Sequence, residues 1–318
     1  MLEAVWDYCN PYEWMERTAR SKMPPLMIQA AITGGIHGKE TNPNLPESIE
    51  EQVEAACEAF QAGAVAVHVH VRDPENQTIQ TKNPDDYSKL NEMIRKRCPE
   101  MIVNNSTGGM GDLTIREKLA PLFAECKPDI VSLNPGPFVG VQKYKERLEP
   151  LPNPRPEKLV DFIMPITYDD VYETAKLCIE KKVKPEIEIF HPGHFWIVND
   201  LINKKLIGPP YILQLVMGFP TGTYPTPNNF LASVTEMPKG SIFFGPGMGP
   251  YQLPVNVLSM IMGGHVRVGL EDNVYYKKGE LAKNSAQQVE RIIRIAGEMN
   301  RTIATVEEAR QMLGLSTN

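Results

Sequence analysis

The sequence predicts a (β/α)₈ TIM barrel, an α/β fold in which eight parallel strands alternate with helices. Three observations lead to this class. Eight short runs rich in apolar and β-branched residues recur along the chain, helix-like stretches separate them, and the series spans roughly 250 residues, a usual length for this barrel. A doubly wound sheet is the rival, but it would normally place a glycine-rich phosphate loop directly before its first helix. The segment TGGIHGKETNPNLP (33–46) lacks that spacing.

The expected elements follow in chain order. The strands are expected at residues 26–33, 64–71, 101–105, 129–134, 186–190, 211–216, 241–245 and 265–269. Helix-like stretches cover 48–63, 83–97, 113–126, 169–182 and 254–264. In the first of them apolar residues recur at helical spacing and Gly63 supplies the stop. Residues 135–168 are proline-rich and irregular, so we expect an elaborated loop after strand four, where substrate covers tend to lie.

The chain is expected to divide into an N-terminal arm, residues 1–25, and one barrel catalytic domain, residues 26–318. The arm contains Trp6 and Trp14 among other aromatic residues. Free tails are usually poorer in aromatic residues, so we expect the arm to pack on the body or on a neighbouring subunit.

Composition excludes several classes of function. A formal net charge of −6 argues against a nucleic-acid-binding protein, which needs a basic face. The five cysteines are scattered and odd in number, as is typical of reduced thiols in the cytoplasm. No apolar run approaches the roughly 20 residues of a membrane span, and the first residues lack a signal-peptide layout. We therefore expect a cytoplasmic protein whose partners are small molecules or other proteins.

Barrel enzymes collect their reactive groups at the carboxyl ends of the strands. In this chain those ends carry a polar set, made up of His68, His70, Asn104, Ser106, Thr107, Ser132, Asn134, Glu188, His191, Arg267, Glu271 and Asp272.

Two histidines on strand two are the strongest candidates for metal ligands. Strand side chains alternate between faces, so His68 and His70 share one face while Val67, Val69 and Val71 lie on the other. Neutral imidazoles suit zinc, and a carboxylate as third ligand would leave coordination positions open for water or substrate. The alternative is a pair of polar residues at the barrel mouth with ordinary hydrogen-bond partners.

Spacing leaves the third ligand open among five residues, Glu271, Asp272, Glu188, Asp73 and His191. Arg267 would be costly to bury unpaired, so a carboxylate such as Asp272 or Glu188 should accompany it. A structural ion pair that closes the barrel would explain the same residues.

The turn NNSTGGMGD (104–112) follows strand three. Its hydroxyls and the backbone amides near Gly108 and Gly109 could hold a carboxylate or another anion. An ordinary turn between a strand and a helix is equally compatible with this sequence.

Six motifs occur together in order: AAITGGIHGKETNPNLP (30–46), VHVHVRD (67–73), NNSTGG (104–109), SLNPG (132–136), PEIEIF (185–190) and HVRVGLEDN (265–273). From about residue 26 to the C-terminus the chain thereby resembles the β-keto acid cleavage enzymes, the family of 3-keto-5-aminohexanoate cleavage enzyme. The resemblance implies a zinc-dependent barrel, usually a homotetramer, and we expect a homotetramer or a homodimer. It also implies a reaction in which a β-keto acid and the co-substrate acetyl-CoA give acetoacetate and a new acyl-CoA.

The resemblance also assigns roles to individual residues. The ligands of Zn²⁺, or of another divalent metal, would be His68, His70 and Glu271. Asp272 would be the base that initiates carbon–carbon chemistry, assisted by Arg267 and Glu188. The substrate contacts would be Ser106, Gly109, Ser132, Val71 and Ile36.

One position departs from the family pattern. Four residues before the glutamate of KExNPNLP, the 3-keto-5-aminohexanoate enzyme has a glutamate that binds the substrate's amino group, whereas this chain has Ile36. Burying an ammonium without a partner costs several kcal/mol, so we expect a substrate without the 5-amino group and with a neutral or apolar tail. His37 and Lys39 leave an anionic tail open.

Two other enzyme classes also use metals in barrels. Amidohydrolase-like enzymes carry HxH on the first strand, but here residues 26–33 precede the pair and the run YILQLVMGFP (211–220) has no histidine. An aldol-type lyase would cleave its substrate without CoA. A metal-stabilised binding protein would retain metal and show no turnover.

The segment GPGMGPYQ (245–252) is either a contact for CoA or a tight turn.

Overall fold

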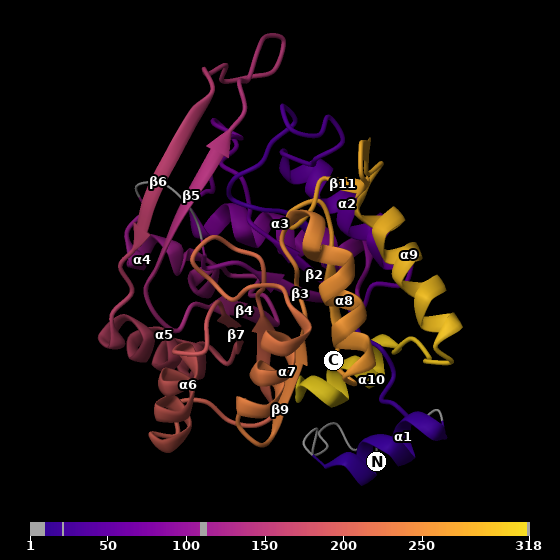
Figure 1. Cartoon of the computed structure of the whole chain (residues 1–318). Helices are drawn as coiled ribbons and strands as arrows, with labels where there is room; N and C mark the ends of the chain where they lie inside the picture. The colour runs from indigo at the N-terminus through magenta and orange to yellow at the C-terminus, as the bar shows by residue number, and fades with distance from the viewer. Residues whose placement is uncertain (1–9, 21, 109–112, 317–318) are drawn as a thin grey trace.

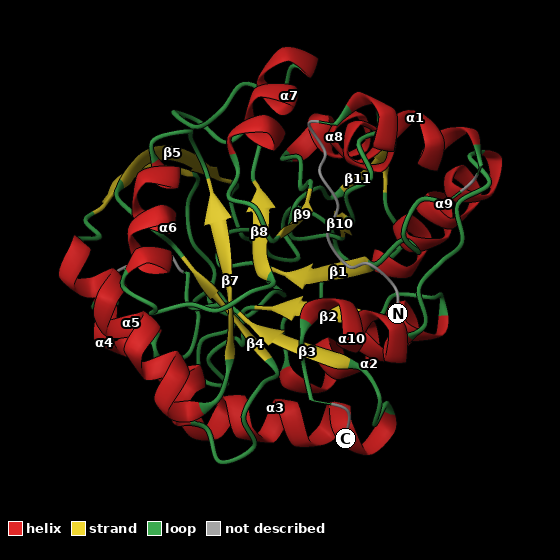
Figure 2. Ribbon diagram, turned by 90° about the horizontal axis from the view of Figure 1, so that it is seen from below, coloured by secondary structure: helices red, strands yellow, loops and turns green. Residues whose placement is uncertain are grey.

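The computed structural model describes residues 10–20, 22–108 and 113–316. Its centre is a barrel of eight parallel strands in the order β10-β1-β2-β3-β4-β7-β8-β9 (Figures 1 and 2). The strands are β1 Ile28–Thr33, β2 Ala66–Val69, β3 Ile102–Asn105, β4 Ile130–Leu133, β7 Lys184–Ile189, β8 Tyr211–Leu215, β9 Ser241–Phe244 and β10 Val266–Val268. All eight predicted strands and the predicted fold class are confirmed.

The ring closes between β9 and β10 through the residue that precedes β10. The backbone N–H of His265 donates to Phe243 at 2.8 Å, and the N–H of Gly245 donates to the carbonyl of His265 at 3.1 Å. Ring closure brings the carboxyl ends of β2 and β10 to the same mouth, although some two hundred residues separate them in sequence.

Helices surround the barrel (Figure 2). They are α1 Pro11–Ala19, α2 Ile49–Gln61, α3 Pro84–Arg97, α4 Ile115–Lys118, α5 Tyr168–Lys181, α6 His194–Asn203, α7 Pro227–Glu236, α8 Gln252–Ile261, α9 Ser285–Glu298 and α10 Val306–Leu313, with 3₁₀ helices η1 Ala120–Phe123 and η2 Gly249–Tyr251.

Local sequence explains where these helices begin and end. A capping box between Ser48 and Glu51 starts α2, and its apolar face packs in a layer against β1, β2, β3 and β10. The single helix predicted over 113–126 is wrong. The chain there forms α4 and then η1, because Pro121 has no N–H and its ring would clash with the carbonyl of residue 117 in an α-helix.

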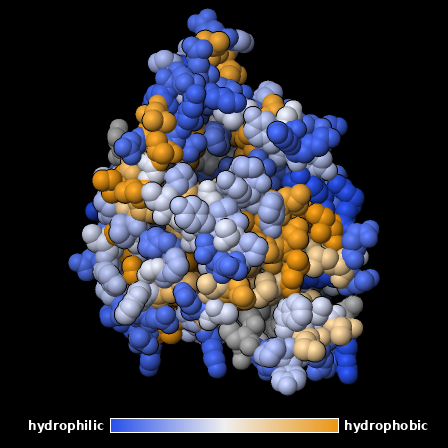
Figure 3. All heavy atoms as spheres, viewed as in Figure 1, coloured by the Kyte–Doolittle hydropathy of each residue, from blue (hydrophilic) through white to orange (hydrophobic). Residues whose placement is uncertain are grey.

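The segment after β4 lies where the sequence predicts, but it is not irregular. It forms an antiparallel hairpin of β5 Phe138–Tyr144 and β6 Lys158–Met164, which projects beyond the barrel mouth (Figure 1). In the space-filling view it is a protrusion that carries both apolar and polar side chains (Figure 3). A second small hairpin, β11 Tyr275–Lys277 and β12 Glu280–Leu281, follows β10.

Helix α1 is the part of the predicted arm that the structure describes continuously. None of its residues is buried, and Tyr12 is 81% exposed. Trp14 is nevertheless half-buried, and its Nε1 is inaccessible to solvent. Packing of the arm on the body or on a neighbouring subunit stays a prediction, and residues 1–9 lie outside the described residues. No helix in the described part of the chain is both long and apolar enough to cross a membrane.

Candidate active site and metal centre

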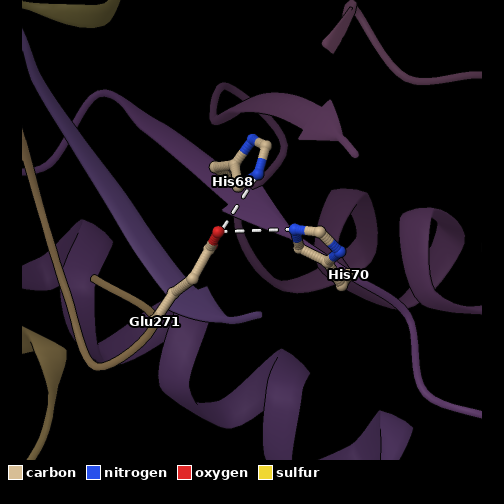
Figure 4. A group of neighbouring side chains, drawn as sticks. All are labelled: His68, His70 and Glu271. Carbon is tan, nitrogen blue, oxygen red and sulfur yellow. Dashed lines mark ion pairs between the residues drawn. The ribbon is translucent and has the colours of Figure 1, made fainter. Parts of the chain in front are cut away.

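The two histidines share the inner face at the end of β2. His68 is fully buried, His70 is nearly so, and their rings lie 5.4 Å apart (Figure 4). Val67 and Val69 point the opposite way, into the apolar layer between barrel and helices. The alternation predicted from VHVHV is therefore present in the structure.

Glu271 reaches the histidines because two glycines permit a close approach. Gly269 has φ +147°, and a Cβ there would lie 1.9 Å from the carbonyl oxygen of Ala31. The turn therefore passes against β1, where the Glu271 amide donates to Ala31 at 3.1 Å. A Cβ on Gly34 would lie 2.6 Å from Glu271 Cγ, so that glycine leaves space for the glutamate side chain.

These three side chains form one cluster. Glu271 Oε1 lies 3.3 Å from His70 Nε2, and Oε2 lies 3.7 Å from His68 Nε2 (Figure 4). The three ligand atoms are all within 4.8 Å of one another. His68 Nε2 and Glu271 Oε2 are buried and have no hydrogen-bond partner within the described residues. Two imidazole nitrogens and a carboxylate oxygen with unpartnered atoms fit a divalent metal ion.

The protonation states also fit a metal. Burial lowers the pKa of His68 well below its usual value, so its ring is neutral at pH 7. Gln80, which the sequence prediction missed, orients His70. The Gln80 amide nitrogen donates to the Tyr87 hydroxyl at 2.8 Å, so its oxygen is the atom 2.8 Å from His70 Nδ1. His70 Nδ1 must then carry the proton, which leaves Nε2 free to bind a metal.

Arg267 joins the metal cluster to two further carboxylates. Its Nε donates to Asp272 Oδ2 at 3.0 Å and its Nη2 donates to Oδ1 at 2.9 Å. Nη2 also donates to Glu271 at 2.7 Å, and Nη1 lies 3.5 Å from Glu188 Oε1. The prediction that buried carboxylates accompany Arg267 is therefore met, and they lie beside the metal cluster.

Burial and Arg267 act in opposite directions on these acids. Burial raises the pKa of Glu188 to about 7 and that of Asp272 to about 6, although Arg267 opposes both shifts. Burial also disfavours ionised Glu271, but Arg267 and the two histidines together hold its pKa below the usual value. Glu271 is thus the carboxylate best kept ionised for a metal, and Asp272 is the more basic neighbour.

The other proposed third ligands lie elsewhere. Asp73 uses its carboxylate to cap the turn amides of Glu75 and Asn76 at 2.8 and 3.0 Å. The His191 ring packs 3.9 Å from that of His194 and is not part of the metal cluster.

Some of the residues predicted to contact the substrate line the cavity, and others lie behind its wall. Ser106 and Ile36 line a cavity of about 1180 Å³ at the barrel mouth, together with His70, Glu188, Arg267, Glu271 and Asp272. Ser132 is fully buried behind this wall, where it accepts from the Thr107 amide at 3.0 Å and lies 3.4 Å from Ser106 Oγ.

Two further residues predicted to contact the substrate, Val71 and Gly109, are not found on the described cavity wall. Val71 lies in the apolar layer beneath the helices, because its side chain faces away from the two histidines. Strand alternation therefore directs the Val71 side chain away from the cavity, which corrects the predicted contact of this side chain with the substrate. Gly109 lies outside the described residues.

An aromatic cluster on the cavity wall was not predicted. Phe138 and Phe162 of the hairpin meet Phe190 and Phe219 from the loops after β7 and β8, and the rings of Phe138 and Phe190 stack at 4.4 Å. The β-branched Val139 and Val141 in FVGVQKY are the only local signal for the strand that carries Phe138.

An ion network that was also not predicted fixes this hairpin in place. It joins the buried Arg147 and the partly buried Arg155 to two glutamates. Arg147 donates to both carboxylate oxygens of Glu47 at 2.8 Å and to Glu40 at 2.6 Å, and Arg155 donates to Glu40 at 2.8 Å. The hairpin is thereby bound to residues 34–47, the loop that carries Ile36.

A polar layer inside the barrel also escaped the sequence prediction. Glu186 accepts from Gln29 at 3.0 Å and from Asn104 at 2.7 Å, and Gln214 donates to Gln29 at 2.8 Å. Asn104 is the register partner of His68, so this layer supports the metal cluster at the same level of the barrel.

The sequence profile of one family spans nearly the whole chain. The profile described as beta-keto acid cleavage enzyme matches residues 25–315. The chain belongs to this family. The resemblance inferred from the six motifs is confirmed.

Curated relatives in the family differ in substrate. The chain is 36% identical over 296 residues to the 3-keto-5-aminohexanoate cleavage enzyme of Acetoanaerobium sticklandii, covering 92% of this chain and 100% of that protein. It is 33% identical to the 3-oxoadipate:acetyl-CoA acetyltransferase of Cupriavidus necator, covering 92% and 95%. It is 31% identical to the 3-dehydrocarnitine:acetyl-CoA trimethylamine transferase of Rhizobium meliloti, covering 92% and 97%.

A solved structure supports the fold. ObcA in its binary complex with oxaloacetate superposes with a TM-score of 0.70 at 21% identity, covering 86% of this chain and 68% of that chain. At this identity the similarity concerns the barrel alone.

Proposed function

We propose that this protein cleaves a β-keto acid with acetyl-CoA, yielding acetoacetate and the CoA ester of the remaining acyl group. One observation carries the proposal within this family. A metal-ligand cluster and a separate carboxylate, Asp272, lie on one cavity wall and are joined by Arg267. Hydrolysis or aldol cleavage would be compatible with the metal cluster, but two of the three named relatives carry acetyl-CoA in their names.

The metal proposed here is zinc, held by His68, His70 and Glu271. Two imidazole nitrogens and one carboxylate are ligands that zinc accepts while keeping positions open. When bound, the ion would act as a Lewis acid on the ketone and carboxylate oxygens of the keto acid.

Asp272 is proposed as the base that removes a proton from C2 of the keto acid, between ketone and carboxylate. Its pKa of about 6 leaves it ionised at pH 7 while making it more basic than an ordinary aspartate. The two hydrogen bonds from Arg267 hold the plane of the Asp272 carboxylate. They also stabilise this carboxylate in its ionised form, before it takes the proton and after it gives the proton up.

The keto acid carboxylate is proposed to meet Ser106 and, by the family resemblance, Gly109. Ser106 lines the cavity, and its Oγ accepts from the Gly108 amide at 3.1 Å, which leaves the hydroxyl proton available for a substrate oxygen. Ser132 is proposed to position Ser106 and Thr107 from behind.

The substrate tail is proposed to lack a 5-amino group. The described carboxylates on the cavity wall are Glu188, Glu271 and Asp272, and all three contact Arg267. Ile36 and the four phenylalanines supply apolar wall instead. An ammonium on the tail would be buried without a carboxylate partner, which disfavours it by several kcal/mol.

A panel assay tests the proposed function. Purified protein of known metal content is mixed with acetyl-CoA and a series of β-keto acids, and acetoacetate and new acyl-CoA are measured. We expect both products only when acetyl-CoA is present. Turnover without acetyl-CoA would instead indicate the hydrolase or the lyase.

Two further properties are proposed from the sequence. The cytoplasm is the proposed location, consistent with four unpaired cysteines among the described residues. A homotetramer or homodimer is the proposed assembly, consistent with the exposed Leu159 and Ile163 on the outer face of β6. Light scattering coupled to size-exclusion chromatography measures the assembly.

A further inference from the structure

The cavity is larger than a keto acid needs. A pocket of about 300–1000 Å³ accommodates a drug-sized ligand, whereas this cavity measures about 1180 Å³. It extends from the metal cluster to the hairpin β11–β12 and to Arg291 of α9. Both hairpins lie at the upper end of the barrel in Figure 1, so the hairpin β11–β12 forms part of the cavity mouth.

The hairpin β11–β12 is fixed to α9 and brings cations to this mouth. Arg291 donates to the carbonyl of Tyr276, and its guanidinium lies 4.7 Å from the centre of that ring. Arg294 donates to the Tyr276 hydroxyl at 2.9 Å. Lys277 and Lys278, at the tip, line the cavity beside Arg291.

Nearby acids neutralise these cations only in part. Lys277 has an exposed ion pair with Glu280 at 2.9 Å, a type that contributes little. Among the described residues no ion pair to Lys278 occurs, and Arg291 Nε is buried without a hydrogen-bond partner. The acids of the cavity wall are all bound to Arg267. A net positive mouth on a chain of net charge −6 favours an anionic ligand.

Flat side chains lie next to the cations. Tyr251 of η2 and Tyr275 of β11 are 45% and 40% exposed, and both line the cavity. The 3₁₀ helix η2 packs beside β11, and the Gly249 amide donates to the carbonyl of Asp272 at 2.7 Å. A ligand that reaches from Asp272 to the hairpin would therefore pass these rings, which suit an aromatic base.

We propose that Lys277, Lys278 and Arg291 bind the phosphates of the CoA nucleotide, with Tyr251 and Tyr275 beside its adenine. The assignment rests on the proposed function and adds the site of its co-substrate. It also locates the CoA contact suggested for GPGMGPYQ (245–252), whose Tyr251 contributes a ring. Lys145, the other lysine on the wall, belongs to the hairpin β5–β6.

Calorimetric titration of the protein with CoA tests the proposed phosphate site, because it measures binding and does not depend on turnover. The double variant Lys277→Gln/Lys278→Gln removes two exposed charges and should bind CoA about tenfold more weakly than wild type. The matched control Lys239→Gln/Lys283→Gln removes two exposed lysines outside the cavity wall and should bind CoA as wild type does. In kinetics, KM for acetyl-CoA should rise in the first variant, while KM for acetyl-pantetheine, which lacks the nucleotide, should not change.

The outcomes separate the site from the function. Wild-type binding of CoA that the first variant leaves unchanged would overturn the assignment and leave the proposed function intact. If both double variants bind CoA equally more weakly than wild type, the loss reflects the overall charge of the protein, and the assignment is overturned as well. If wild type neither binds CoA nor forms acetoacetate, the proposed function itself fails.

Discussion

At the scale of single residues, the metal cluster depends on side chains that are fixed before any ion binds. His70 is oriented by Gln80, and Glu271 is admitted by Gly34. His68 has no hydrogen-bond partner at Nε2 within the described residues, so its burial is best explained by a ligand role.

Replacing His68 with alanine should remove both metal and turnover. Two remaining ligands hold an ion much less firmly than three, so we expect at least about a hundredfold loss of metal affinity. Metal content after dialysis and the rate of acetoacetate formation measure the two effects. His191→Ala is the control, because His191 lies outside the cluster and should leave both unchanged. Metal retained in His68→Ala would contradict the ligand assignment.

Replacing Ile36 with glutamate should change substrate preference. The new carboxylate would face the cavity and could pair with a 5-amino group, so kcat/KM for 3-keto-5-aminohexanoate relative to 3-oxohexanoate should rise about tenfold or more. The control Ile36→Gln introduces a side chain of the same size as glutamate but without the charge, so it should not raise the relative kcat/KM for the amino substrate. A wild-type enzyme that already prefers the amino substrate would refute the inference from Ile36.

Sequence patterns predicted the residues that act through their own chemistry better than those that support them. The spacing of His68 and His70 follows from strand alternation, but the choice of Glu271 needed the family resemblance. Gln80 could not be predicted, because its role depends on a loop that folds back to contact His70. Val71 was assigned to the substrate, although the same alternation directs its side chain away from the cavity.

At the scale of elements, the hairpin β5–β6 is held by a buried ion network. Arg147 and Glu47 are almost completely inaccessible, and both terminal guanidinium nitrogens of Arg147, Nη1 and Nη2, donate to that carboxylate. The network joins the hairpin, which carries Phe138 and Phe162, to the loop that carries Ile36. The proposed tail site is therefore preformed by contacts that lie outside it.

Replacing Arg147 with alanine should lower the free energy of unfolding by about 3–5 kcal/mol, because Glu47 would remain buried without its arginine, while Glu40 would keep only Arg155. Urea unfolding measures the change. The control Lys143→Ala breaks an exposed ion pair of the same hairpin with Glu157 and should cost less than about 1 kcal/mol. Equal effects of the two substitutions would show that the Arg147 network does not stabilise the protein.

Strands were predicted better than the segments between them. Each barrel strand is a short buried run rich in β-branched residues, which makes it visible in sequence. Residues 138–164 were missed as a hairpin because its outer face also carries apolar side chains, such as Leu159 and Ile163, so the usual alternation of apolar and polar residues is blurred. The helix predicted over 113–126 is too long because Pro121 ends the α-helical hydrogen bonding after α4.

At the scale of the whole molecule, the closed barrel creates the site. Histidines from β2, an arginine from β10 and Glu188 from β7 meet only because the strands form a ring with one common mouth. Local sequence predicts the strands, and the barrel class predicts which of their ends meet. The cavity's size and its cationic rim required the three-dimensional arrangement.

The fate of the acetyl carbons tests the central claim most directly. In the proposed reaction the acetyl group of acetyl-CoA becomes carbons 3 and 4 of acetoacetate, while carbons 1 and 2 come from the keto acid. With doubly ¹³C-labelled acetyl-CoA and an unlabelled β-keto acid, mass spectrometry should find both labelled carbons in acetoacetate and none in the new acyl group. Acetoacetate without the label, or labelled acetate as the main product, would contradict the account.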